Sequence, residues 1–291
     1  RRKFLARGVA YAVRVINDKV SEALVGMDPQ QQAQIDQAIM DLTRRATDMI
    51  LCEMQAELGA NTMLAVSIAA CKAGAAEKEV PLYKHIADLV GKSATTLPVP
   101  ANTVINGGKH AGNGLPIQEI MILLVGAMNF EEAMQMGSET YHHLKDIILE
   151  KCGSDSCNIG DHGGFAPNIS SISEGLDLVI AAIERAGYNG RIKLTIDVAA
   201  TDFCVAWDDL LMSDPERIKR AVSEYTCNAL VLKANQVGTV TEAIEVVKQA
   251  NDAHWGVMVS HRSGDTEDSF IADLAVGAAA GQIKASVPCR G

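Results

Sequence analysis

The sequence predicts an α/β protein in which a mostly helical segment precedes a sheet of parallel strands. Two observations lead to this fold class. Apolar residues recur at helical spacing up to about residue 97, and beyond that point short apolar strands alternate with amphipathic helices. In addition, charged side chains directly follow several of these strands, as they do at the active-site end of a (β/α) barrel.

The first 97 residues carry helical patterns. A first helix is indicated by apolar residues that step by three or four positions, namely Val9, Val13, Ile16 and Val20. Residues 63–70 are apolar nearly all round, which indicates a buried helix. Prolines at 98 and 100 stop helices and favour extended chain. We therefore expect a mostly helical domain over 1–97 and a second domain over 98–291.

Helices and strands alternate after this boundary. Helices are expected over 130–150, with Asn129 as cap and Gly153 as stop, and over 171–187 behind a capping box of Ser171 and Glu174. Asp214 and Pro215 open the next helix. The remaining helices are expected at 239–250 and 267–280, and the strands at 192–198, 229–232, 257–259 and 282–284. This alternation predicts parallel strands joined by crossover helices.

Polar residues gather at one end of the predicted sheet. Five of them lie at or just beyond the C-terminal end of an apolar strand: Asp197, Asp208, Lys233, His261 and Lys284. Any one alone is equally well explained as a solvated loop charge. Because five strand ends deliver charge to the same rim, the pattern favours an active site there.

The run at 260–268 (Ser-His-Arg-Ser-Gly-Asp-Thr-Glu-Asp) stands where a strand leads into a helix, a position that often binds anions. Arg262 can grip a phosphate with two donors, and Ser263 can add a third. The alternative is a surface turn in which Asp265 or Thr266 caps the following helix. The segment alone leaves both open.

Composition narrows the classes of partner. The chain has 291 residues, 48% of them hydrophobic, and a net charge of −10. Its Lys and Arg are scattered, so we expect no nucleic-acid partner. No apolar run approaches the roughly 20 residues of a membrane span, and no signal-peptide pattern opens the chain. Seven dispersed cysteines suit reduced thiols, so we expect a cytoplasmic protein.

Long motifs in this chain resemble the enolase family, and the resemblance covers nearly the whole sequence. The matching runs lie at 97–101, 104–113, 118–123, 163–168, 196–200, 208–211, 232–239 and 260–268. The chain looks most like plant-type enolases. The resemblance implies an enolase-like fold, with an N-terminal α+β domain followed by a (β/α)8-type barrel.

The resemblance also implies an activity, that of the glycolytic lyase phosphopyruvate hydratase. This activity interconverts 2-phospho-D-glycerate and phosphoenolpyruvate with Mg²⁺, in a cytosolic homodimer. Removing a proton beside a carboxylate creates a dianion, and enolase-type sites stabilise it with a Lys or His base and Mg²⁺. By resemblance Lys233 is the base, His162 stands at the position of the acid, and His261 is a further catalytic residue.

Binding roles follow from the same resemblance. Asp197 and Asp208 would hold Mg²⁺, whose hardness suits carboxylate oxygens. Lys284 would bind the substrate carboxylate, and Arg262 with Ser263 its phosphate. The full set of expected substrate-binding residues is His110, Glu119, Asp208, Ser260, His261, Arg262, Ser263 and Lys284.

The chain departs from the family at the site. The family has a glutamate acid where this chain has His162, and a positioned acid is worth roughly 10²–10⁴ in rate. Between the strand at 192–198 and the segment that starts at Asp208 the family has several dozen residues, including a third metal ligand, where this chain has only 199–207. The chain also begins after the family's first strands and stops before its last helices. We therefore expect a remnant N-terminal domain and an incomplete barrel, internally deleted near 203–208 and truncated at its C-terminus.

Two hypotheses remain. In the first, the chain is an enolase that acts on a small phosphorylated substrate. In the second, it is a non-catalytic relative, surviving as a binding or regulatory protein or as a non-functional gene product. A Mg²⁺-dependent assay of phosphoenolpyruvate formation distinguishes them.

Overall fold

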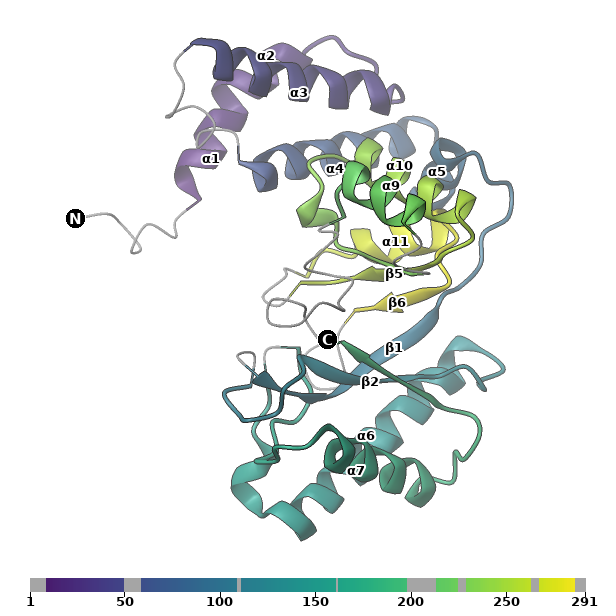
Figure 1. Ribbon diagram of the computed structural model, residues 1–291. Coiled ribbons are helices and arrows are strands. Elements are labelled where there is room, and N and C mark those ends of the chain that lie inside the picture. Colours follow the sequence, from purple (N-terminus) through teal and green to yellow (C-terminus); the bar gives the residue numbers. More distant parts are fainter. Residues whose placement is uncertain are drawn as a thin grey trace, which may run out of the picture.

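The computed structural model describes residues 9–49, 59–108, 111–160, 162–197, 213–224, 229–262 and 267–285. A six-stranded sheet forms its centre, and helices cover the sheet in two groups (Figure 1). The N-terminal part consists of helices: α1 (Ala10–Val15), the π-helix η2 (Ile16–Val20), α2 (Ser21–Leu24), α3 (Gln32–Met49), α4 (Ala60–Glu77) and α5 (Leu82–Val90). Of the helices described, none is long and apolar enough to cross a membrane.

The sheet is an open barrel whose strands run in the order β3-β2-β1-β6-β5-β4. In chain order the strands and the helices between them are β1 (Val99–Asn106), β2 (Glu119–Leu123), α6 (Phe130–Cys152), η4 (Ser154–Cys157), α7 (Ile172–Arg185), β3 (Lys193–Asp197), α9 (Pro215–Ser223), β4 (Ala229–Leu232), η5 (Ala234–Gln236), α10 (Val240–Asp252), β5 (Gly256–Ser260), α11 (Phe270–Gly277) and β6 (Gln282–Lys284). The expected incomplete barrel is therefore observed.

The expectation of parallel strands throughout was wrong for β2, which runs antiparallel to both β1 and β3. Residues 107–118 join β1 to β2, and the described part of this connection contains no α-helix, so the chain turns back beside itself. Two helices, α6 and α7, then return the chain to the same end of the sheet. The pairs β1–β6, β6–β5 and β5–β4 are parallel, as expected.

Two separate cores support the two halves of the sheet. Helices α6 and α7 pack against β1 and β2, around residues such as Ile120, Leu144 and Phe165. Helices α4, α5, α9, α10 and α11 pack against β4, β5 and β6, around Leu230, Val247 and Leu274. Figure 1 shows the two groups of helices on opposite sides of the molecule. The strand ends of both halves meet between them.

Local signals explain most helix boundaries. The Asn129 side chain accepts from the Glu132 amide at 2.8 Å and starts α6, and Asp214 does the same for α9 through the Glu216 amide at 2.9 Å. The capping box at 171–174 was wrong, since the Ser171 side chain makes no cap hydrogen bond. Helix α11 begins at Phe270, three residues later than expected, where Asp268 accepts from the Phe270 amide.

The first helix also differs from expectation. Val20 is buried, but Val9 and Val13 are 71% and 49% exposed. The π-helix at Ile16–Val20 widens one turn, so residues before it no longer share a face with those after it.

Asp36 on α3 connects the N-terminal helices to the barrel. Its buried carboxylate accepts a hydrogen bond from the amide of Thr241, at the start of α10, at 2.9 Å.

Candidate active site

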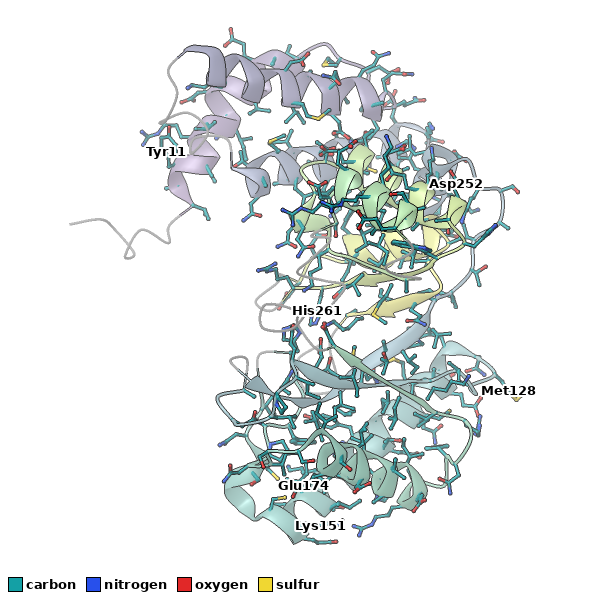
Figure 2. The ribbon with its side chains drawn as sticks, viewed as in Figure 1. Tyr11, Met128, Lys151, Glu174, Asp252 and His261 are labelled. Atoms are coloured by element: carbon teal, nitrogen blue, oxygen red, sulfur yellow. The ribbon has the colours of Figure 1, made fainter. Side chains whose placement is uncertain are left out.

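Residues from both halves of the sheet converge at one rim of the open barrel. Lys233 directly follows β4, His261 directly follows β5, and Lys284 ends β6. Glu119 lies at the same rim because β2 is antiparallel and begins where its neighbours end; it is the register partner of Asp197, the last residue of β3. Figure 2 shows His261 between the two halves of the molecule.

Glu119 and Lys284 form a buried ion pair at the centre of this rim. Their side chains are 0% and 1% exposed, and the ammonium donates to the carboxylate. The Thr103 hydroxyl donates to the other carboxylate oxygen. Burial opposes ionisation of Glu119, but the charges of Lys284 and His162 and these hydrogen bonds outweigh it, so the pKa of Glu119 lies below its ordinary value.

His162 lies beside this ion pair. Its Nδ1 is 3.7 Å from a Glu119 carboxylate oxygen, and its Nε2 is 3.3 Å from the side-chain nitrogen of Gln118. Its ring meets that of His261 edge-on, with centroids 5.6 Å apart and an interplanar angle of 86°. Both imidazoles are buried. The two histidines therefore form one wall of the rim next to a carboxylate and an ammonium.

The loop that carries His162 is fixed by its backbone. The Asn106 side chain accepts from the Gly164 amide at 2.9 Å, and the Tyr141 hydroxyl donates to the Gly163 carbonyl at 2.8 Å. A Cβ on Gly160 would lie 2.6 Å from the Cβ of Asn106, so no larger residue fits there without displacement. Close packing of Gly160 against the Asn106 side chain, together with these two hydrogen bonds, thus positions the loop that carries the imidazole.

Lys233 is buried at the end of β4. Its backbone amide donates to the Ser213 hydroxyl at 3.2 Å, and that hydroxyl donates to the Gln236 side-chain oxygen at 3.1 Å. Ser213, with a positive φ of 50°, stands just before α9. The residues that follow β4 are therefore held by the segment that precedes α9.

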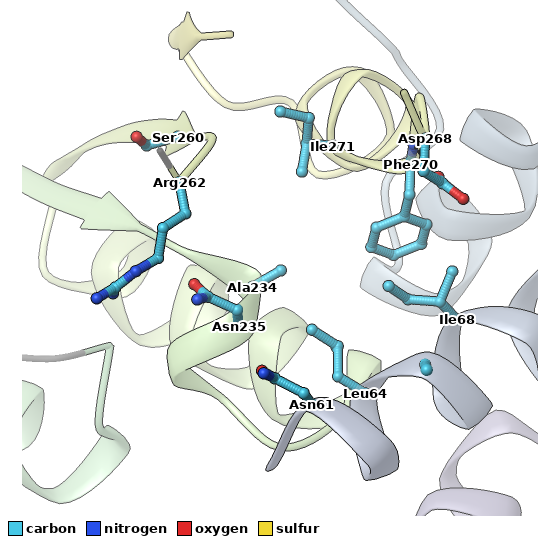
Figure 3. Close-up of a pocket in the computed structure, with 11 residues that line it drawn as sticks. Asn61, Leu64, Ile68, Ala234, Asn235, Ser260, Arg262, Asp268, Phe270 and Ile271 are labelled. Atoms are coloured by element: carbon cyan, nitrogen blue, oxygen red, sulfur yellow. Dashed lines mark hydrogen bonds between the residues drawn. The ribbon is translucent and has the colours of Figure 1, made fainter. Parts of the chain in front are cut away.

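Other expected site residues are arranged differently. Asp197 and Lys284 line a cavity of about 400 Å³ that extends between β3 and β4, the two outer strands of the described sheet. Ser260 and Arg262 line a separate pocket of about 330 Å³ against α4 (Figure 3). His110, Asp208 and Ser263 lie outside the described residues, so their expected roles stay predictions.

Two residues of the rim were not predicted as site residues from the sequence. Thr103 donates to Glu119, and Gln118 contacts His162. Thr103 lies in the middle of a buried strand, where a threonine is an ordinary strand residue. Gln118 belongs to the matching run at 118–123, but only the fold brings it to His162, 44 residues away in sequence.

Fold and rim together define an α/β-barrel protein with a buried, mixed-charge site for a small polar ligand. Two family models match the chain: "Enolase, C-terminal TIM barrel domain" over residues 94–207 and 204–291, and "Enolase, N-terminal domain" over residues 1–86. The chain belongs to the enolase family. The barrel model matches in two parts that meet at 204–207, where the sequence predicted an internal deletion.

Individual members of the enolase family are also similar to this chain in sequence. "Cytosolic enolase 3" of Arabidopsis thaliana is 52% identical over 99% of this chain and 72% of its own length. "Enolase" of Solanum lycopersicum is 46% identical, and "Enolase 2" of Hevea brasiliensis 44%, each over 99% of this chain and 79% of the relative. The resemblance to plant enolases is thereby confirmed, and so is the expectation that the chain is shorter than they are.

Proposed function

We propose that this chain binds 2-phospho-D-glycerate at the barrel rim and catalyses its reversible dehydration to phosphoenolpyruvate, the glycolytic reaction of the enolase family. The observation that carries the proposal is the convergence of three buried basic residues, Lys233, His261 and Lys284, at the strand ends of a barrel of this family. A developing dianion needs such a concentration of positive charge.

In this proposal each residue acts on a stated part of the substrate. Lys233 removes the proton beside the carboxylate, Lys284 orients the carboxylate, and Arg262 holds the phosphate with its planar donors. Lys284 is paired with Glu119, so its ammonium is held in position before the substrate carboxylate binds to it. Preorganisation of this kind lowers the cost of binding.

Mg²⁺ is the cofactor we infer. No group of three or more His, Cys, Asp or Glu side chains that could hold a metal occurs among the described residues. Mg²⁺, however, keeps several waters and binds through one or two carboxylates together with substrate oxygens. Asp197, a hard oxygen donor on the wall of the cavity, fits that pattern, with Asp208 as the second expected ligand. When bound, Mg²⁺ offsets the negative charge that develops on the substrate.

Mg²⁺ binding has a test that does not depend on turnover. Titration calorimetry with MgCl₂ and phosphoenolpyruvate should show that phosphoenolpyruvate binds more tightly when Mg²⁺ is present. Asp197→Asn should remove most of this enhancement, because it removes a charged ligand. An enhancement of equal size in Asp197→Asn would contradict the assignment of Asp197.

The proton donor is the residue at which this site differs from that of the family. We propose that His162 replaces the family's glutamate as the acid that protonates the leaving hydroxide. Imidazole has an ordinary pKa near neutrality and can donate a proton. Its Nδ1 lies 3.7 Å from a carboxylate oxygen of Glu119, at the rim where the substrate is expected. Because a ring places its proton differently from a carboxylic acid, turnover roughly 10²–10⁴ below that of an ordinary enolase is expected.

A second function, non-catalytic binding, is favoured by His162 and by the two-part match to the barrel model. Lys233→Ala separates the two functions. If the chain is an enzyme, the purified protein forms phosphoenolpyruvate with Mg²⁺, and Lys233→Ala abolishes turnover while retaining phosphoenolpyruvate binding. If the chain only binds, calorimetry shows binding in both proteins and the assay shows turnover in neither.

We further infer a cytosolic homodimer with a domain boundary at 97/98. The name of the relative "Cytosolic enolase 3" supports the compartment. Sedimentation equilibrium of the full chain tests the oligomeric state, and limited proteolysis near residue 97 tests the boundary.

A further inference from the structure

Two cysteines lie in consecutive elements at the C-terminal end of α6. Cys152 is the last residue of α6, and Cys157 ends the short helix η4 that follows it. Figure 2 shows Lys151, the neighbour of Cys152, at the end of the molecule away from His261. Both thiols are free and partly buried. The dehydration proposed above assigns no role to either of them.

The turn between the two cysteines folds η4 back against α6. Gly153 has a positive φ of 82°, a conformation that suits glycine and in which the helix ends. The Ser156 hydroxyl then donates to the Cys152 carbonyl at 3.0 Å. The Cys157 Sγ lies 3.9 Å from the carbonyl oxygen of Lys145, a residue of α6. Cys157 therefore lies alongside the last turns of the helix that Cys152 ends.

Both thiols lie on the same side of α6. Lys145 and Cys152 are seven residues apart, and at about 3.6 residues per turn this spacing places them within about 20° of each other around the helix axis. A helical side chain leans toward the N-terminus of its helix, which brings the Cys152 thiol toward the turn that Cys157 contacts. Both cysteines also pack against the same apolar core. The two sulfurs are thus neighbours in the folded chain.

The charges around the two sulfurs differ. Burial raises the pKa of Cys157, and the ammonium of Lys145 is the next influence and lowers it. Burial also raises the pKa of Cys152, and there the carboxylate of Glu174 is the next influence and raises it further. The C-terminal end of α6 carries partial negative charge, which disfavours a thiolate at Cys152 as well. Of the two, Cys157 therefore forms the thiolate more readily.

We propose that Cys152 and Cys157 are a redox-active pair that a small disulfide, such as oxidised glutathione, converts into an intrachain disulfide. The Cys157 thiolate first attacks one sulfur of the small disulfide, which forms a mixed disulfide and releases one thiolate. The Cys152 thiolate then attacks the Cys157 sulfur, which forms the intrachain bond and releases the second thiolate. The protein gives up two electrons and two protons. The small disulfide takes up the electrons, and its two thiolates take up the protons.

This pair goes beyond the proposed function, because it acts on no atom of the substrate. It is nevertheless connected to the rim. The carbonyl of Asn158, next to Cys157, accepts from the Ala166 amide at 2.7 Å, and His162 lies between these two residues in sequence. An intrachain bond at Cys157 therefore restrains the turn that leads into the loop of His162. In a reducing compartment disulfides are usually transient and redox-sensing, so the pair closes only when the surroundings become oxidising.

Peptide mapping gives a direct readout of the pair. Trypsin places both cysteines, and no other cysteine, on the peptide 152–185, because no Lys or Arg lies between Lys151 and Arg185. The full chain is equilibrated with reduced and excess oxidised glutathione at about pH 8, near the ordinary pKa of a thiol, and is then treated with iodoacetamide. We expect this peptide to be unalkylated and lighter by two hydrogen atoms than the reduced peptide.

The same equilibrium in urea shows whether the folded turn is responsible. Unfolding separates Cys157 from α6, so the intrachain disulfide should be at least about tenfold less favoured in urea than in the folded chain. Tenfold corresponds to about 1.4 kcal/mol.

A shifted pair is the matched control. The double variant Lys151→Cys with Cys152→Ala keeps two thiols in the same segment but turns one of them by about 100° around α6. Lys151 is exposed, so the change leaves the core intact. The shifted pair should close at least about tenfold less favourably than the parent pair.

Two single variants test the order of attack. In Cys152→Ser the mixed disulfide should accumulate at Cys157, because the second step is blocked. In Cys157→Ser less mixed disulfide should form at Cys152, whose thiolate is disfavoured. Equal amounts in the two variants would contradict the order of attack.

Three results would overturn the proposal: a fully alkylated peptide at a large excess of oxidised glutathione, a disulfide as favourable in urea as in the folded chain, or a shifted pair that closes as readily as the parent pair. Circular dichroism should show that the variants fold. If the shifted variant does not fold, the comparison between urea and the folded parent chain decides.

Discussion

The two halves of the sheet are built differently and meet at the candidate site. The half formed by β1, β2 and β3 is antiparallel and is covered by α6 and α7, whereas β4, β5 and β6 are parallel and are covered by the remaining barrel helices and by α4 and α5. Five register pairs join β2 to β3, but only two join β1 to β6. The contact between the halves is therefore short.

Site residues come from both halves. Glu119 and His162 belong to the antiparallel half, and His261 and Lys284 to the parallel half. The ion pair between Glu119 and Lys284 crosses the short contact. The polar site is therefore also part of what holds the two halves together. Changes to the site should therefore alter stability as well as ligand binding.

The largest effect on stability is expected from Lys284→Met. This change leaves the buried Glu119 carboxylate without its counter-charge, and breaking one side of a buried pair costs about 3–5 kcal/mol. Urea unfolding measures the loss. The double variant Glu119→Gln with Lys284→Met removes both charges and should unfold at a higher urea concentration than the single variant. A single variant as stable as the double one would show that the ion pair does not connect the halves.

A smaller loss is expected from Asp36→Ala, which affects only the parallel half. Its carboxylate accepts from the partly buried Thr241 amide and from Gln32, and its removal leaves the Thr241 amide without this acceptor at a cost of about 1–3 kcal/mol. Asp41→Ala on the same helix is the control, because among the described residues Asp41 accepts from Gln37 in an exposed hydrogen bond. Equal urea midpoints for the two variants would contradict the anchoring role of Asp36.

Acid should weaken the parallel half through His85. Within the described part of the chain, neither ring nitrogen of this fully buried histidine has a hydrogen-bond partner, and burial, followed by Lys78, lowers its pKa. The unfolded chain therefore binds a proton at higher pH than the folded chain does. The contribution is fully present above the ordinary histidine pKa and is lost as pH falls below it. Denaturant unfolding at pH 7 and pH 5 should show a smaller acid loss in His85→Phe than in the parent chain.

The smallest effect concerns thiol reactivity. Burial, followed by the charges of Asp36 and Asp273, raises the pKa of Cys71 to about 12. At a given pH its thiolate fraction is therefore roughly a thousandfold below that of an ordinary thiol. Cys152 and Cys157 in the antiparallel half are only partly buried. Peptide mapping after brief iodoacetamide treatment should find these two cysteines alkylated and Cys71 unmodified. Early alkylation of Cys71 would mean that the parallel half opens readily.

Elements with local signals could be predicted from the sequence. Strands β4 and β6 begin and end where expected, because each is a short apolar run, and α10 follows its Thr239 cap. The antiparallel direction of β2 could not be predicted, since it depends on how the flanking connections return the chain. The π-helix at Ile16–Val20 leaves no pattern that distinguishes it from an α-helix.

The site, too, has residues that could be predicted from the sequence and contacts that could not. Lys233, His261 and Lys284 were found because each ends or follows an apolar strand. The pairing of Glu119 with Lys284 could not be predicted from strand patterns, because 165 residues separate the two partners. They meet because β1, the neighbour of β2, pairs with β6. The position of His162 was suggested by resemblance, and its contacts with Gln118 and His261 required the fold.

The most direct measurement is the rate of Mg²⁺-dependent phosphoenolpyruvate formation by the purified chain and by His162→Glu. If the rim is an enolase site limited by its acid, the chain turns over slowly and His162→Glu raises the rate by roughly 10²–10⁴. If neither protein forms phosphoenolpyruvate at saturating Mg²⁺, the chain is not an enzyme of this family's reaction, and the basic residues at the rim serve binding alone.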